Sequence, residues 1–203
     1  MEHDRRSAWV LVPRTDQKQV PWRNGKGSTR EIAIDPPDAT VAGAFRWRVS
    51  SAPVLSSGPF SQFAGIDRSL WLLEGAGMQL SIDGASHRLD QRLQRIDFAG
   101  ESSVTAELRN GPVVDLNVMV NRAQICAKAE IVCDAQHVFT GPASGLIVAI
   151  GDASIRSEDE PNQRALALAD GDALRVEIAA DQQVHVAVRG TALCAEFRRK
   201  PQD

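Results

Sequence analysis

Short runs of alternating residues, separated by closely spaced turns, constrain this chain more than any other feature. Alternation divides residues 113–120 into two faces. One face is apolar and consists of Val114, Leu116, Val118 and Val120, and the other is mixed and consists of Val113, Asp115, Asn117 and Met119. Asp83 and Gly84 form a strong hairpin signal between two further runs. Because such runs follow one another without an amphipathic helix, the sequence predicts an all-β antiparallel barrel or sandwich.

Polar residues interleave with apolar ones on two of the expected strands. In residues 45–52, Arg46, Arg48 and Ser50 alternate with the apolar positions, and solvation is the simpler explanation for the polar side of a lone strand. The mixed face of residues 113–120 suits instead the lumen of a small barrel, where a few polar groups orient a ligand within an apolar wall. An edge strand is the alternative.

The segment from residue 21 to residue 34 combines a glycine loop with an arginine-bearing strand. Gly25 and Gly27 flank Lys26, so the loop can approach a ligand closely. In the strand of residues 29–34, alternation places Arg30 on the side of Ile32 and Ile34. Such an arginine either meets an anion or reaches water at the strand end.

The second half of the chain repeats the first weakly and in the same order. Residues 144–151, 165–178 and 183–190 resemble residues 69–75, 88–98 and 103–108. This pattern predicts two small barrels in tandem within a single unit of residues 1–203. We expect residues 9–122 to form the first barrel, which holds the site, and residues 123–200 to form a second, mainly structural barrel.

Composition and charge exclude several classes of function. The 203 residues are 43% hydrophobic, which suffices for a full core, and the net charge of −3 gives no basic footprint for nucleic acid. No apolar run after the charged start resembles a signal, and none is long enough to cross a membrane, so we expect a cytoplasmic protein. The three cysteines predict reduced thiols, with Cys194 buried in a strand.

Residues for metal binding or nucleophilic catalysis are not arranged as those chemistries require. The four histidines, at positions 3, 87, 137 and 185, are isolated from one another, and no G-x-S-x-G motif is present. We therefore expect no metal and no other cofactor. Glu31, Asp67 and Asp115 are most simply interpreted as partners of Arg30, Arg48 or Arg68.

Several ordered blocks between residues 21 and 122 resemble those of the HutD/Ves family of bacteria. The blocks are PWRNGKGSTREIAI, FRWRVSSAPVLSSGPFSQFAGIDRSLWLLEGAG, FAGE and GPVVDLNVMVNR. The resemblance implies a metal-free, cupin-like bicupin, that is, two double-stranded β-helices. It also implies a site for a small polar ligand such as N-formylglutamate and a role in moderating histidine utilisation, without an established catalytic activity. Lys26, where the family usually has glycine, and Ala64, where it usually has proline, depart from its pattern.

Carried over residue by residue, the resemblance implies a ligand site of ten residues. They are Asn24, Thr29, Arg30, Arg48, Ser50, Ser61, Asp67, Arg68, Asp115 and Asn117. We expect Arg48, with Arg30 or Arg68, to bind a ligand carboxylate through charge-assisted hydrogen bonds. Asn117, Asn24 and Ser50 would contact neutral polar atoms.

Two other functions stay open beside a regulatory binding protein. One is a cofactor-independent isomerase or hydrolase that uses Asp67 or Asp115 as base. Its sign would be a carboxylate of raised pKa that faces the ligand rather than pairs with arginine. The other is a sugar-binding cupin, although the chain has no tyrosine for an aromatic platform. A homodimer also stays open, because cupin-like proteins often pair through sheet edges.

Overall fold

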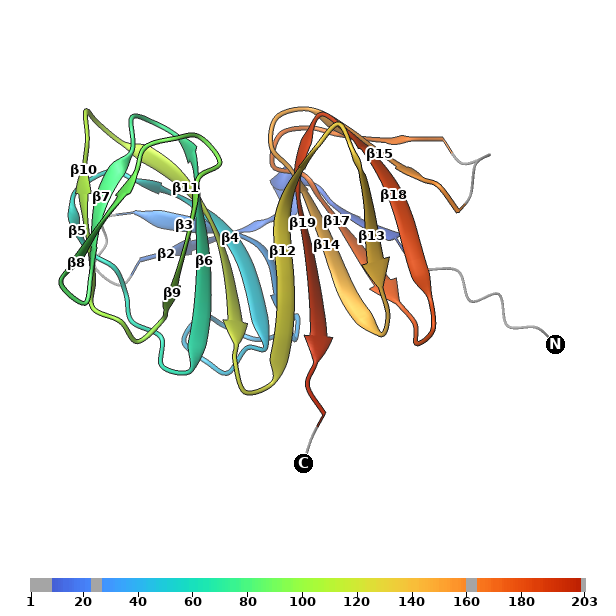
Figure 1. Ribbon diagram of the computed structural model, residues 1–203, viewed down its shortest axis with the longest axis horizontal. Coiled ribbons are helices and arrows are strands. Elements are labelled where there is room, and N and C mark those ends of the chain that lie inside the picture. The colour runs from blue at the N-terminus through green and yellow to red at the C-terminus, as the bar shows by residue number, and fades with distance from the viewer. Residues whose placement is uncertain (1–8, 23–26, 160–163, 202–203) are drawn as a thin grey trace. The chain divides into compact units, whose positions relative to one another are not determined.

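The computed structural model describes residues 9–22, 27–159 and 164–201, and these residues form an all-β fold (Figure 1). The one helix among them is the 3-10 turn η1 (Arg14–Asp16), and no helix in the described part of the chain is long and apolar enough to span a membrane. The chain divides into two compact units. The 17–125 unit runs from Gln17 to Ile125, and the split unit joins the chain up to Asp16 to the chain from Cys126 onward.

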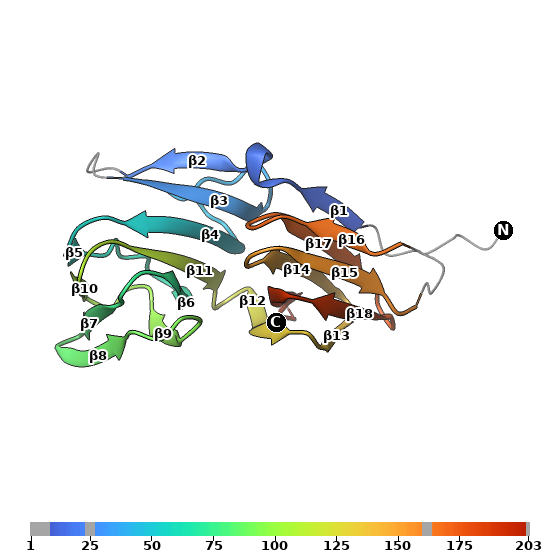
Figure 2. The same ribbon diagram turned by 90° about the horizontal axis from the view of Figure 1, so that it is seen from above.

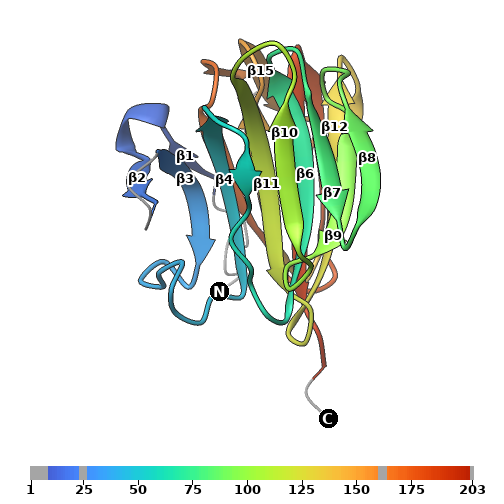
Figure 3. The ribbon, with the colours of Figure 1, turned by 90° about the vertical axis from the view of Figure 1, so that its left-hand side faces the viewer.

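The 17–125 unit is built from two antiparallel sheets. The six-stranded sheet has the order β2 (Lys18–Pro21), β3 (Ser28–Asp35), β4 (Trp47–Val54), β11 (Val113–Asn121), β6 (Ile66–Glu74) and β9 (Arg95–Ala99). The four-stranded sheet has the order β5 (Gly58–Pro59), β10 (Val104–Leu108), β7 (Met78–Ile82) and β8 (Ala85–Leu89). Figure 3 views this unit with the four-stranded sheet in front of the six-stranded sheet. The expected hairpin at Asp83 and Gly84 joins β7 to β8.

One side of the six-stranded sheet faces the four-stranded sheet across an apolar core. Val54, Leu72 and Val113 of the first sheet and Met78 and Leu80 of the second belong to one buried cluster. Because Val113 lies in this core, alternation along β11 turns the mixed face, with Asp115, Asn117 and Met119, to the same side. We call this side of the six-stranded sheet the inner face.

The split unit also has two antiparallel sheets. The five-stranded sheet has the order β1 (Trp9–Val12), β17 (Ala173–Ile178), β14 (Ala143–Ala149), β19 (Thr191–Arg199) and β12 (Ile125–Cys133). The four-stranded sheet has the order β13 (Gln136–Thr140), β18 (Gln183–Arg189), β15 (Ala153–Ser157) and β16 (Leu166–Leu168). Residues 9–16 were expected in the first half, but β1 pairs with β17 and so completes a sheet of the second half.

Strand order repeats between the two units. Figure 2 shows β2, β3, β4 and β11 of the 17–125 unit side by side in this order. The strands β4, β11, β6 and β9 follow one another as β12, β19, β14 and β17 do, and β5, β10, β7 and β8 follow one another as β13, β18, β15 and β16 do. Each strand of the second set stands eight strands after its counterpart. The weak repeat in the sequence therefore corresponds to a repeat in topology.

Candidate functional site

Charged and polar side chains form a band across the inner face of the 17–125 unit. Residues that lie opposite one another on neighbouring strands point to the same side of a sheet. One row of opposed residues is Glu31, Ser50, Asn117 and Leu70, and the next is Ile34, Arg48, Met119, Arg68 and Phe98. Asp115 lies in the adjoining row between Ala52 and Leu72. We call Glu31, Arg48, Ser50, Arg68, Asp115 and Asn117 the polar band, and all six are buried.

Arg48 and Glu31 form a buried ion pair within this band. Arg48 Nε donates to Glu31 Oε2 at 2.7 Å, and its Nη1 lies 3.3 Å from Ser50 Oγ and 3.9 Å from Met119 Sδ. The side chains of the pair are only 5% and 6% exposed. Arg48 and Ser50 are thus buried on the inner face, and solvation, the simpler expectation from sequence, is wrong for both.

Arg68 lies among three phenylalanine rings. Its guanidinium carbon is 4.8 Å from the ring centre of Phe98, 5.5 Å from that of Phe60 and 5.7 Å from that of Phe63. Nη1 donates a long hydrogen bond of 3.3 Å to the Ser61 carbonyl oxygen. Burial and, to a smaller extent, the charge of Arg48 lower the pKa of Arg68, while the charge of Asp115 raises it. The net pKa is about 10. Arg68 therefore keeps its positive charge at neutral pH.

Asp115 is a buried carboxyl group that is attracted by the charge of Arg68. Burial raises its pKa to about 7, while the charge of Arg68 and a hydrogen bond from the Ala52 backbone N–H oppose the rise. The attraction to Arg68 acts through space, without a side-chain hydrogen bond between the two groups. The expectation that this aspartate serves as the direct partner of an arginine is therefore not met, because the direct partner of Arg48 is Glu31.

Two fully buried side-chain atoms of the described residues have no hydrogen-bond partner. They are Arg68 Nε, a donor, and Asn117 Oδ1, an acceptor. Leaving such a group unsatisfied costs on the order of 1–3 kcal/mol, and more when it is charged. Both atoms belong to the polar band. The inner face therefore has a free donor that could bind an acceptor of a ligand, and a free acceptor that could bind a donor of a ligand.

Four of the other expected site residues have side chains that lie away from the band, namely Thr29, Arg30, Ser61 and Asp67. The position of Arg30 depends on an irregularity in β3. A β-bulge at Ile32 shifts the register between Glu31 and Ala33. Arg30 therefore lies opposite Ser51, on the other side of the sheet from Ile34, and the expectation that they share a side is wrong. Its Nη1 bonds to Gln17 Oε1 at 2.5 Å.

Thr29, Asp67 and Ser61 have structural partners of their own. Thr29 Oγ1 accepts a hydrogen bond of 2.8 Å from Trp22 Nε1, and Ser61 reaches the band only through its carbonyl oxygen. Asp67 is exposed and pairs with Arg122 rather than with Arg30, Arg48 or Arg68. Asn24 lies outside the described residues.

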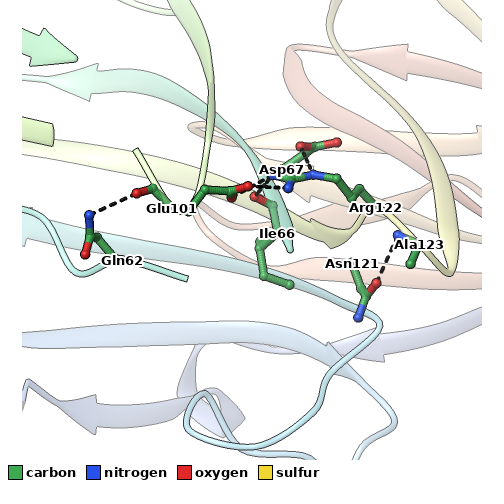
Figure 4. Close-up of polar contacts among 7 residues, drawn as sticks. All are labelled: Gln62, Ile66, Asp67, Glu101, Asn121, Arg122 and Ala123. Atoms are coloured by element: carbon green, nitrogen blue, oxygen red, sulfur yellow. Dashed lines mark hydrogen bonds and ion pairs between the residues drawn. The ribbon is translucent and has the colours of Figure 1, made fainter. Parts of the chain in front are cut away.

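Arg122 ties together the segments that surround the band (Figure 4). Its guanidinium bonds to Glu101 at 2.5 and 2.8 Å, to Asp67 at 2.8 Å and to the Ile66 carbonyl oxygen at 2.9 Å. Its backbone N–H donates to the Gly65 carbonyl oxygen at 3.1 Å. The bonds to Arg122 lower the pKa of Glu101 to about 2. Arg122 thus anchors the end of the loop of residues 60–65, whose Phe60 and Phe63 contact Arg68.

Glu101 and Gly100 fasten the same loop at its middle. Gln62 Nε2 donates to the Glu101 carbonyl oxygen at 2.9 Å, and Phe63 N–H donates to the Gly100 carbonyl oxygen at 2.7 Å. A Cβ added at Gly100 would lie 2.5 Å from the Phe63 carbonyl oxygen, so this close approach requires glycine. The loop is therefore held closed over Arg68 by backbone contacts as well as by ion pairs.

The corresponding strands of the split unit carry an apolar interior. Ile147 and Ala149 of β14, with Ala192 and Cys194 of β19, belong to its buried cluster. Glu196 is the next residue on that side of β19, and its oxygens accept hydrogen bonds from Thr140 N–H and Arg198 Nε. Among the described residues, the same arrangement of strands therefore leaves no buried side-chain atom unsatisfied in the split unit and two in the 17–125 unit.

Sequence reasoning missed the residues that surround Arg68 and anchor its loop. Glu101 and Arg122 lie within the blocks FAGE and GPVVDLNVMVNR, and the family resemblance of these blocks is the signal that could have pointed to them. Phe60, Phe63 and Phe98 carried no polar signal at all. No group of three or more histidine, cysteine or acidic side chains suited to a metal ion occurs among the described residues.

Paired antiparallel sheets with a repeated strand order give the chain a cupin-like fold. A cupin 2 conserved barrel domain protein from Leptotrichia buccalis shares the fold at a TM-score of 0.52 and 9% identity, over 86% of this chain and 89% of that one. The HutD family model matches residues 14–194, and the chain belongs to this family.

Relatives and solved structures agree with this assignment. Protein Ves of Citrobacter koseri is 39% identical over 136 residues, which cover 65% of this chain and 68% of that protein. An uncharacterised 21.2 kDa protein from the hutC 3′ region of Pseudomonas putida is 32% identical over 68% of this chain and 72% of its own length. The structure of HutD from Pseudomonas fluorescens SBW25, in a formate condition, has a TM-score of 0.81 and 31% identity, over 96% of this chain and 100% of that one.

Proposed function

We propose that this protein binds a small carboxylic acid at the polar band and acts as a ligand-binding regulator rather than as an enzyme. The observation that carries the proposal is the pair of buried, unsatisfied atoms, Arg68 Nε and Asn117 Oδ1. An acid supplies the acceptor that Arg68 requires, and a donor elsewhere on the same molecule satisfies Asn117. Arg48, already held by Glu31, lies in the same row as Arg68 and adds positive potential there.

Two further arguments support a ligand. In the described part of the split unit, the equivalent interior is closed by apolar residues and by Glu196, whose oxygens are hydrogen-bonded, so the fold itself does not require unsatisfied buried groups. We propose on the same ground that the two units are tandem cupin-like copies, of which the 17–125 copy carries the site. All the contacts we invoke come from arginine and asparagine side chains, so the proposal needs no metal.

N-formylglutamate is our first candidate ligand, with a role in moderating histidine utilisation in the cytoplasm. The P. putida relative is named from the hutC region, and the P. fluorescens HutD structure was obtained with formate, a small carboxylate. N-formylglutamate combines carboxylates for arginine with an amide N–H for the Asn117 oxygen. The names of these two proteins support the link to histidine utilisation. The proposal that the ligand is an acid rests on the polar band.

An acid–base enzyme is the second candidate, and Asp115 favours it. A buried carboxyl of pKa about 7, which does not hydrogen-bond to an arginine, has the property expected of a general base at neutral pH. Turnover of a bound acid, detected by product analysis after incubation with the protein, would establish this function in place of simple binding.

Thermal unfolding tests the binding proposal. The melting temperature is measured with formate, N-formylglutamate, urocanate, glutamate and histidine. At roughly a hundredfold excess over its dissociation constant, a ligand of the folded state adds about 2.7 kcal/mol of stability, which is seen as a clear rise. Arg68→Lys, which keeps the charge but loses the Nε–H, should abolish most of the rise.

Arg95→Lys is the matched control. Arg95 also lies over an aromatic ring, at 4.9 Å from Trp71, but it is a partly exposed residue on the opposite side of the sheet from Arg68. This variant should keep the full rise. The absence of a rise with every acid at millimolar concentration would contradict the proposal.

A further inference from the structure

The buried charges of the inner face balance one another before any ligand is present. Arg48 and Glu31 compensate each other through a direct bond of 2.7 Å. Arg68 and Asp115 remain, and the charge of each shifts the pKa of the other toward its charged form. The opposite sheet lines this core with the apolar residues Met78, Leu80, Leu89, Val104 and Ala106. His87 lies opposite Leu80 and so points to the same side of that sheet, but it is exposed to solvent. The loop over Arg68 contributes the rings of Phe60 and Phe63.

A bound anion would upset this balance. An acid that accepts a hydrogen bond from Arg68 takes over the positive charge that compensates Asp115. Two negative groups would then share one buried guanidinium, and an uncompensated buried charge is costly. Neutralisation by a proton removes that cost, and Asp115 is the carboxyl group of the band that lacks a direct ion pair.

We propose that the polar band binds its acid together with one proton, and that Asp115 carries this proton. The inference rests on the proposed function, because it describes how the same site receives an anion. Once protonated, Asp115 carries an O–H group. This group can donate a hydrogen bond to the acid, as the arginine does. The site then holds an anion, a cation and a neutral carboxyl instead of two carboxylates and one cation.

The electrostatics of Asp115 agree with this role. Burial raises its pKa, and the charge of Arg68 is the main influence that opposes the rise, with a net value of about 7. An anion at Arg68 cancels that influence, so the pKa of Asp115 rises further in the complex. Above pH 7, the free protein holds Asp115 mostly ionised and the complex holds it protonated, so binding takes a proton from solution.

Calorimetry measures this proton directly. The heat of binding N-formyl-L-glutamate is recorded at pH 8 in Hepes and in Tris, whose ionisation enthalpies differ, and the comparison gives the protons taken up per acid. For a free pKa of about 7 we expect uptake of about 0.9 proton at pH 8 and about 0.1 at pH 6. The dissociation constant should rise almost tenfold between pH 8 and pH 9.

Two variants locate the proton. Asp115→Asn keeps a polar group of the same shape, so it should still bind the acid, with uptake near zero and an affinity that no longer falls above pH 7. Glu107→Gln, which removes an exposed carboxylate of β10, should behave as the parent does. Circular dichroism and the melting temperature confirm that both variants are folded.

The outcomes separate the two proposals. Binding by the parent without uptake at pH 8, or uptake that persists in Asp115→Asn, overturns the proton inference and leaves the acid site intact. If the parent binds neither N-formyl-L-glutamate nor formate, the acid site is refuted. The proton inference is then refuted as well.

Discussion

Replacing Asp115 by asparagine should stabilise the unliganded protein at neutral and alkaline pH. The folded-state pKa of Asp115 is about 7, compared with its ordinary value of 3.8. Between these two values the folded state binds the proton and the unfolded state does not, so this carboxyl makes the free energy of unfolding fall as pH rises. The difference of about three pKa units corresponds to roughly 4 kcal/mol, lost in full above pH 7. Asparagine does not ionise and avoids this loss.

Urea unfolding from pH 4 to pH 8 measures the effect as a difference between variant and parent. At pH 4 the parent Asp115 is protonated in the folded state and only about half ionised in the unfolded state, so the two proteins should differ by less than about 1 kcal/mol in their free energies of unfolding. At pH 8 the variant should be more stable by about 2–4 kcal/mol, with most of the change between pH 5 and pH 7. Glu107→Gln, an exposed carboxylate of β10, is the control and should track the parent. A constant difference across this pH range, or a variant that is less stable at pH 8, would refute the account of Asp115.

Three further predictions follow from other contacts. Arg48→Ala leaves Glu31 buried without its cation and should cost about 3–5 kcal/mol in urea unfolding, whereas the double change with Glu31→Ala should cost less than the sum of the single changes; additive costs would show that the pair is not coupled. Burial raises the pKa of Cys194 to about 12, so a thiol reagent should label the exposed Cys126 and Cys133 in the folded protein and Cys194 only after unfolding; three labelled thiols in the native state would contradict this. Glu101→Gln weakens the anchor at Arg122, so hydrogen exchange in the loop of residues 60–65 should accelerate while that of β11 stays unchanged; equal rates in variant and parent would show that backbone contacts alone hold the loop.

Alternation and turn residues were sufficient to predict much of the fold. The strand expected at residues 113–120 is β11, its mixed face points inward, and the hairpin at Asp83 and Gly84 lies between β7 and β8. These features depend on neighbours in sequence. The repeated strand order was also visible, since each unit buries a similar apolar pattern along the chain.

Features that depend on distant pairing could not be predicted in the same way. The bulge at Ile32 is set by the register of β3 against β4, and it moves Arg30 to the other side of the sheet. Asp67 pairs with Arg122, 55 positions away, although Arg68 is its neighbour in sequence. β1 pairs with β17, so that Trp9 lies opposite Val176, a residue in the other half of the chain. Neither the bulge, nor this ion pair, nor this strand pairing can be recognised from residues that are neighbours in the sequence.

Among the ten expected site residues, the positions of those on β4 and β11 could be predicted best from the sequence. Arg48, Ser50, Asp115 and Asn117 alternate with apolar residues and lie together on the inner face. Arg68 joins them from β6, because it lies opposite Met119. Its aromatic surroundings come from β9 and from the loop of residues 60–65, which no periodicity connects to it.

The most direct test of the acid site observes the Arg68 Nε–H itself. In a protein labelled with nitrogen-15, the arginine Nε–H signals are recorded during titration with N-formyl-L-glutamate, and the Arg68 signal is assigned by its loss in Arg68→Lys. We predict that this signal moves on titration and that its exchange with water slows, because the buried donor gains a carboxylate acceptor. A signal that stays unchanged while the acid binds would place the ligand elsewhere and contradict the assignment of the polar band.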